Sequence, residues 1–144
     1  MIEIRRAMTA DADAIWPLTR ELATTFEPEH GAFDRAIASL VARDDAFLGV
    51  GVSTSSTGER ATGYVLAVAH PTLFANAPVV WVEEVMVREV ERRSGVGRAL
   101  MDAVEAWARE LGAAYVSLAT RRASDFYLAL GYEESATFFR KVLK

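Results

Sequence analysis

Residues 85–97 read Val-Met-Val-Arg-Glu-Val-Glu-Arg-Arg-Ser-Gly-Val-Gly, and residues 98–111 continue as Arg-Ala-Leu-Met-Asp-Ala-Val-Glu-Ala-Trp-Ala-Arg-Glu-Leu. The first three residues end an apolar run that is typical of a buried strand. Beyond the glycines, Leu100, Val104 and Trp107 recur at helical spacing, and Gly112 follows where a helix commonly ends. The stretch therefore predicts a strand, a glycine loop and a helix in direct succession.

A helix that begins inside a glycine loop presents unpaired N–H groups and partial positive charge, which together bind phosphate. Gly95 and Gly97 lack the Cβ that would keep the backbone from closing around such a group. Arg92, Arg93 and Arg98 add positive charge. The spacing fits neither the mononucleotide P-loop nor the dinucleotide fingerprint. We expect a pyrophosphate site of another kind, and the alternative is a helix start with a flexible cap.

The composition of the 144 residues narrows the function further. The chain has no cysteine, which excludes disulfides, zinc-thiolate sites and a cysteinyl acyl-enzyme. A formal net charge of −4 argues against nucleic-acid binding. We expect a cytoplasmic protein with one domain, residues 1–144, and no membrane partner, since no run is long and apolar enough for a signal core or a span. The histidines, His30 and His70, have no carboxylate at metal-ligand spacing, so no metal is assigned.

The remaining elements follow from periodicity and turn residues. Strand 2–8 precedes a helix capped by Thr9 or Asp11, whose expected core face is Ile15, Leu18, Leu22 and Phe26. Pro17 predicts a kink or a later start in this helix. A second helix begins near residue 34. The expected later elements are strands 47–52 and 62–69 as an antiparallel hairpin around a loop at 53–59, strand 79–87, the helix after Gly97, strand 115–119, helix 124–130 and strand 137–143. The order β-α-α-β-β-β-α-β-α-β predicts a mixed α+β sheet flanked by helices.

Arg92, Gly95 and Gly97, preceded by Met86-Val87, resemble the pyrophosphate motif of the GNAT superfamily of acyl-CoA N-acyltransferases. The element order resembles its fold across nearly the whole chain. That resemblance implies a mostly antiparallel sheet whose fourth and fifth strands, 79–87 and 115–119, splay apart. It also implies acetyl-CoA as acyl donor, with its pantetheine arm in the gap. The donor-binding residues implied are Val85, Met86, Val87, Arg92, Arg93, Ser94, Gly95, Val96, Gly97 and Arg98.

A second motif lies further on. Ala123, Tyr127, Gly131 and Tyr132 fall on a pattern of the same family, in which the matching tyrosine contacts the donor and is the usual general acid. A phenol can donate a proton to a departing thiolate. Thr120 stands where the family often has asparagine, so a hydrogen bond to the donor is altered or comes from the threonine hydroxyl. Ordinary packing is the alternative for Tyr127.

Glu83 and Glu84 interrupt an apolar strand, where a carboxylate is costly without a partner. Glu83 shares the alternation of Trp81 and Val85, and neighbouring residues point to opposite faces unless a bulge intervenes. The resemblance implies that the first acid, Glu83, acts as base, often through water, as in some family members with such a pair; Glu84 is the other candidate. A salt bridge or a solvent-exposed edge is the alternative. Two further assignments are Arg121 and Arg122 at the donor's terminal phosphate and Trp81, Phe74 and Tyr64 in an acceptor pocket.

The expected function is transfer of an acetyl group from acetyl-CoA to a primary amine of a small molecule or protein, by direct attack in a ternary complex. A noncatalytic acyl-CoA-binding or regulatory module and an unrelated α+β protein are the alternatives. We expect residues 21–34, the loop 70–78 and the C-terminal strand to form the acceptor site. The Phe138-Phe139 strand could also pair two copies as a homodimer.

Overall fold

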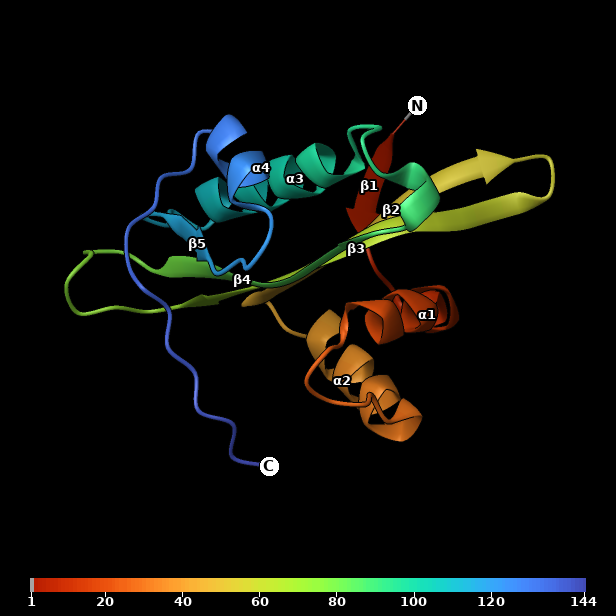
Figure 1. Ribbon diagram of the computed structural model, residues 1–144, viewed down its shortest axis with the longest axis horizontal. Helices are drawn as coiled ribbons and strands as arrows, with labels where there is room; N and C mark the ends of the chain where they lie inside the picture. Colours follow the sequence, from red (N-terminus) through yellow and green to blue (C-terminus); the bar gives the residue numbers. More distant parts are fainter. Residues whose placement is uncertain (1) are drawn as a thin grey trace.

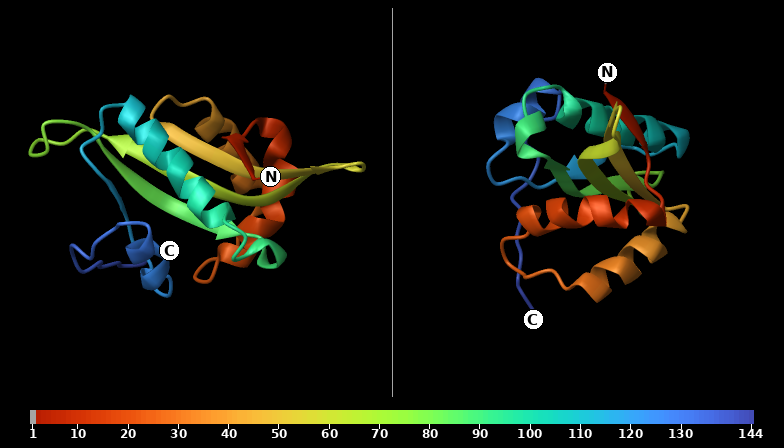
Figure 2. Two further views of the ribbon diagram at one scale, coloured as in Figure 1. Left: turned by 90° about the horizontal axis from the view of Figure 1, so that it is seen from above. Right: turned by 90° about the vertical axis from the view of Figure 1, so that its right-hand side faces the viewer.

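The computed structural model describes residues 2–144 and consists of a five-stranded sheet between two layers of helices (Figures 1 and 2). The strands lie in the order β1-β2-β3-β4-β5; β4 and β5 are parallel and every other pair is antiparallel. Helices α3 and α4 lie on one face, and α1 and α2 on the other (Figure 1). This arrangement confirms the predicted fold class.

The elements are β1 (Glu3–Arg6), η1 (Thr9–Asp11), α1 (Ala12–Leu22), α2 (His30–Val41), β2 (Ala46–Ser55), β3 (Gly58–His70), β4 (Val79–Val87), η2 (Glu89–Glu91), α3 (Val96–Glu110), β5 (Val116–Leu118) and α4 (Ser124–Ala129).

The sheet separates two apolar clusters, because successive side chains of a strand point to opposite faces. The larger cluster joins α3 to one face through Leu100, Val104 and Trp107. The smaller cluster packs Ile15 and Leu18 of α1 on the other face. The sheet is therefore buried on both sides, which explains the nearly continuous apolar runs of its strands.

Helix α3 has the apolar stripe and the two ends that its sequence predicts. Leu100, Met101 and Val104 are fully buried. The helix starts at Gly95, whose φ is +93°, and is followed by Gly112 at φ +70°, both values that glycine adopts without a Cβ clash.

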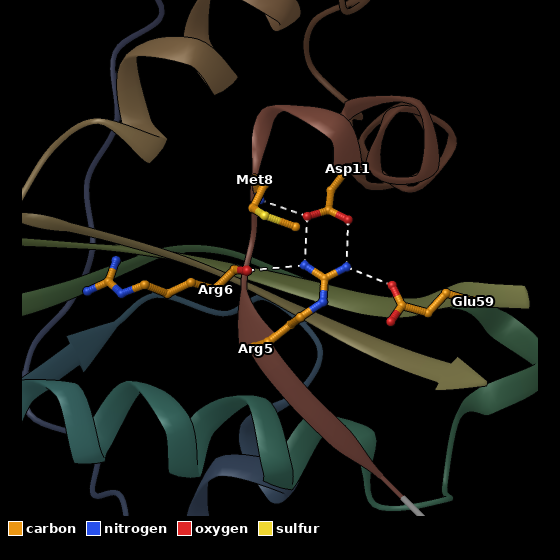
Figure 3. A network of polar contacts seen from close by, with 5 residues as sticks. All are labelled: Arg5, Arg6, Met8, Asp11 and Glu59. Carbon is orange, nitrogen blue, oxygen red and sulfur yellow. Dashed lines mark hydrogen bonds and ion pairs between the residues drawn. The ribbon is translucent and has the colours of Figure 1, made fainter.

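Arg5 ties the first strand to the first helix and to the hairpin (Figure 3). Its guanidinium donates two hydrogen bonds of 2.8 Å to the Asp11 carboxylate and a third to Glu59. Asp11 also accepts the Met8 N–H at 2.7 Å, so it stabilises the turn that leads into α1. The guanidinium lowers the pKa of the Asp11 carboxyl below its usual value. Helix α1 runs through Pro17 from Ala12, so the later start that this proline suggested is not observed.

Three sequence expectations were wrong. The loop expected at 53–59 is a two-residue turn, because the hairpin strands pair out to Ser55 and Gly58. Phe26, assigned to the core face of the first helix, lies beyond the end of α1 and is 55% exposed. The strand expected at 137–143 is absent from residues 2–144, where the chain after α4 forms no regular structure. Strand-forming residues such as Phe138 and Val142 make a strand only where a sheet edge pairs with them, and the edge strand β5 is three residues long.

Candidate active site

Strands β4 and β5 separate halfway along β4. They pair in parallel from Val80 with Val116 to Val82 with Leu118, where β5 ends. Strand β4 continues to Val87, so its last five residues have β3 on one side and, in the part of the chain that the structure describes, no strand on the other. The predicted splay is confirmed, and it leaves a free edge on β4 directly before the glycine loop.

A β-bulge at Glu83 changes which way the residues of β4 point. In the pairing with β3, Val82 lies opposite Ala67 and Glu84 opposite Leu66, so Glu83 is the extra residue. Val80 and Val82 pack in the α3 cluster and so do Val85 and Val87, although strict alternation would separate these pairs. The expectation that Trp81, Glu83 and Val85 share a face was therefore wrong.

The bulge brings both carboxylates to the face covered by α1 and α2. Glu83 is exposed and accepts the Trp81 indole N–H at 2.8 Å. Glu84 is partly buried and accepts the hydroxyl of Tyr64 at 2.7 Å. Neither acid forms an ion pair with any residue in the described range 2–144.

Tyr64 holds Glu84 from the core of the α1 side. The Tyr64 side chain is 2% exposed, and its oxygen accepts the Thr19 hydroxyl of α1 at 3.1 Å. Burial, followed by the nearby Glu84 charge, raises the pKa of Tyr64 well above its usual value, so its hydroxyl stays a donor. Sequence reasoning missed Thr19; its place four residues after Ile15, on the buried face of α1, was the available signal.

The free edge of β4 also carries main-chain hydrogen-bonding groups. Arg88 donates its N–H to the carbonyl of Thr62 at 2.8 Å, so these two residues form a hydrogen-bonded pair. Because such pairs alternate in an antiparallel ladder, Met86 bonds to β3 while Val85 and Val87 turn their N–H and C=O groups away from it. Val85 and Val87 therefore present these groups at the free edge.

The glycine loop follows at once and folds back on β4. Arg92 donates its Nε–H to the Val87 carbonyl at 3.2 Å, and Ser94 donates its hydroxyl to the carbonyl of Glu91. Arg93 has a φ of +65° and Gly95 one of +93°, which turn the chain into α3. Among the described residues, 2–144, no side chain caps α3, so the N–H groups of the first turn are left for a ligand or water.

Helix α4 lies against the first turn of α3. A Cβ on Gly97 would lie 3.1 Å from the Phe126 ring, which shows how closely the helices approach. Tyr127 packs edge-on against the rings of Phe126 and Tyr132, and burial raises its pKa above the usual value. The Thr120 hydroxyl oxygen accepts the Ala123 N–H at 3.1 Å at the turn into α4.

The remaining candidates from the sequence are two arginines, a histidine and a phenylalanine. Arg121 and Arg122 are exposed and, as far as residues 2–144 go, make no ion pair. His30 stacks on Trp16 at a ring-centroid distance of 4.5 Å, and Phe74 is 74% exposed. Within the described range 2–144, no helix is long and apolar enough to cross a membrane.

Comparison with known proteins gives the family. Residues 8–132 match the model of the acetyltransferase (GNAT) family. No curated protein matches the sequence significantly.

Solved structures show the same fold. Glucosamine-6-phosphate N-acetyltransferase from Arabidopsis thaliana superposes with a TM-score of 0.86 at 18% identity, over 100% of this chain and 99% of the other. An acetyltransferase from Trypanosoma brucei gives 0.84 at 24%, over 99% and 100%. AAC(6′)-Iy, in complex with the bisubstrate analogue CoA-S-monomethyl-acetylneamine, gives 0.80 at 22%, over 99% of each chain. With most of its length matched by the family model, the chain belongs to the acetyltransferase (GNAT) family.

Proposed function

We propose that the protein transfers an acetyl group from acetyl-CoA to a primary amine. The observation that carries this proposal is the free edge of β4. Its first residues are two carboxylates that form no ion pair within residues 2–144, and it leads to an arginine-rich helix start that no described side chain caps.

The donor side consists mostly of main chain. The first-turn N–H groups of α3 and the positive end of its dipole suit a pyrophosphate, and Arg92, Arg93 and Arg98 add charge. Val85 and Val87 would bind the amides of the pantetheine arm at the free edge. The Val87 N–H is also the group we assign to the developing oxyanion. The Thr120 hydroxyl still has its proton to donate, although its oxygen accepts from Ala123.

The chemistry needs a base on one face of β4 and an acid on the other. The amine nitrogen attacks the thioester carbonyl; the C–N bond forms and the C–S bond breaks. Glu83 or Glu84, directly or through water, takes the proton that the nitrogen loses. Tyr127 gives its proton to the leaving thiolate and regains one from solvent, so the products are an amide and a thiol. Its raised pKa keeps Tyr127 protonated at neutral pH, as a general acid requires.

Thiol release from acetyl-CoA tests the proposal with a panel of primary amines. The chain has no cysteine to react with a thiol reagent, so the signal reports the product alone. We expect amine-dependent release, with one acetylated amine per thiol by mass spectrometry. Acetyl-CoA binding without release in any small-molecule or peptide pool would favour the noncatalytic acyl-CoA-binding module. Failure to bind acetyl-CoA would reject both functions.

A further inference from the structure

The C-terminal tail comprises residues 133–144, and none of these residues belongs to the candidate active site described above. The family match ends at Tyr132, just before it. Every residue of the tail is exposed, so it adds little to either apolar cluster. It leaves α4, passes the β4–β5 edge of the sheet and ends on the side of α2 (Figures 1 and 2).

Two contacts attach this exposed tail to the face that holds the carboxylates. The Phe138 ring stacks on the Trp81 indole, with centroids 5.9 Å apart and planes 14° from parallel. Arg140 donates a hydrogen bond of 3.2 Å to the hydroxyl oxygen of Thr25, in the link between α1 and α2. The tail therefore spans from β4 to that link.

The contact between Phe138 and Trp81 adjoins Glu83, one of the two carboxylates proposed as base. Trp81, on which Phe138 stacks, donates its indole N–H to Glu83. The neighbouring Phe139 is 87% exposed and makes no aromatic pair in the described part of the chain. One of two adjacent phenylalanines thus adds apolar surface beside the carboxylate, and the other does not.

We propose that the tail forms the acceptor-side wall of the site and that Phe138 is a specificity-determining residue. This inference rests on the proposed acetyl transfer. The acceptor is a primary amine on an apolar frame: the amine lies near Glu83, and the adjoining carbons pack on the rings of Phe138 and Trp81. The wall should not affect acetyl-CoA binding, because the proposed donor-binding groups lie in the glycine loop and along the free edge of β4.

Phe138→Ala and its matched control Phe139→Ala test this wall. We would measure kcat/KM for 2-phenylethylamine and for ethanolamine, and KM for acetyl-CoA. Wild type should prefer 2-phenylethylamine. Phe138→Ala should lower kcat/KM for that amine roughly three- to tenfold, the loss expected for one aromatic packing contact, and leave ethanolamine and acetyl-CoA within about twofold. Phe138→Trp should restore the preference, and Phe139→Ala should behave as wild type.

Equal effects of the two alanine variants, or acetylation of ethanolamine in preference to 2-phenylethylamine, would overturn the wall. Acetylation of other amines, with neither 2-phenylethylamine nor ethanolamine accepted, would also overturn the wall. The proposed acetyl transfer would still hold in that case. No transfer to any amine would overturn both proposals.

The position of the tail has a separate readout without substrate. Phe139→Cys introduces the only thiol of the chain, to which a bimane label can be attached. Trp81 should quench the fluorescence of this label, and the added change Trp81→Phe should increase it. If Trp81→Phe leaves the fluorescence of the label unchanged, the placement of the tail is overturned, whether or not the enzyme is active.

Discussion

The two sides of β4 differ in what builds them. On the α3 side the groups that we propose bind the donor are N–H groups of the main chain, at the start of α3 and along the free edge of β4. On the α1 side the groups that we propose act on the acceptor are side chains: Glu83 and Glu84 with Trp81 and Tyr64. Main-chain sites leave a local sequence motif, whereas side-chain sites depend on which distant residues meet. The first kind suits a donor common to a family, and the second suits an acceptor that varies.

Tyr127→Phe should have the largest effect. The change keeps the ring that packs against Phe126 and Tyr132 but removes the proposed general acid, so kcat should fall about 100-fold or more while acetyl-CoA affinity stays within about twofold. Tyr132→Phe is the matched control, because its hydroxyl bonds to Glu105 instead. In the wild type, loss of rate through ionisation of Tyr127 should begin only above about pH 10, since its pKa is raised. Equal turnover in the Tyr127 variant would remove it from the mechanism.

Arg98→Glu tests the donor side alone. A carboxylate in the first turn of α3 suits the helix dipole but repels a pyrophosphate, so the Kd for acetyl-CoA should rise roughly 10- to 100-fold with little loss of fold stability. Arg109→Glu, at the other end of the same helix, is the control and should leave this Kd unchanged. Titration calorimetry measures both. A Kd that Arg98→Glu does not alter would place the pyrophosphate elsewhere.

Tyr64→Phe tests whether the buried link to Glu84 matters. It removes the hydroxyl that donates to Glu84 and accepts from Thr19, so kcat should fall about tenfold and the free energy of unfolding by about 1–2 kcal/mol. Thr19→Val removes one bond of the same link and spares Glu84, so it should affect stability more than turnover. If the two changes reduce turnover equally, Glu84 is not the group that Tyr64 supports.

Asp11→Asn should have the smallest effect on activity, because it should change stability only. Its pair with Arg5 is partly buried, so losing the charge should cost about 2 kcal/mol at pH 7. The folded pKa of Asp11 is lowered, so this contribution is complete above about pH 4 and is lost as the pH falls through the folded pKa. Urea unfolding of both proteins from pH 7 to pH 2 should show the difference shrink only below about pH 4. Asp45→Asn, in a fully exposed pair with Arg43, is the control and should leave the midpoint unchanged.

The sequence predicted the α3 side better than the α1 side for a physical reason. The path from β4 through Gly95 into α3 depends on neighbours in sequence, and its bounds at Val79–Val87 and its ending glycine were predicted correctly. The bulge at Glu83 depends on register with β3, which local alternation does not contain. Residues 137–143 include strand-forming residues such as Phe138 and Val142, but among residues 2–144 no sheet edge pairs with them.

Initial rates with both substrates varied test the division between the two sides most directly. The variants are Arg98→Glu and the double change Glu83→Gln with Glu84→Gln. We predict that Arg98→Glu raises KM for acetyl-CoA and leaves kcat near wild type. The double change should lower kcat/KM for the amine about 100-fold or more and leave KM for acetyl-CoA within about threefold. Full activity in the double variant, or a change of donor and acceptor constants together in both variants, would contradict the division.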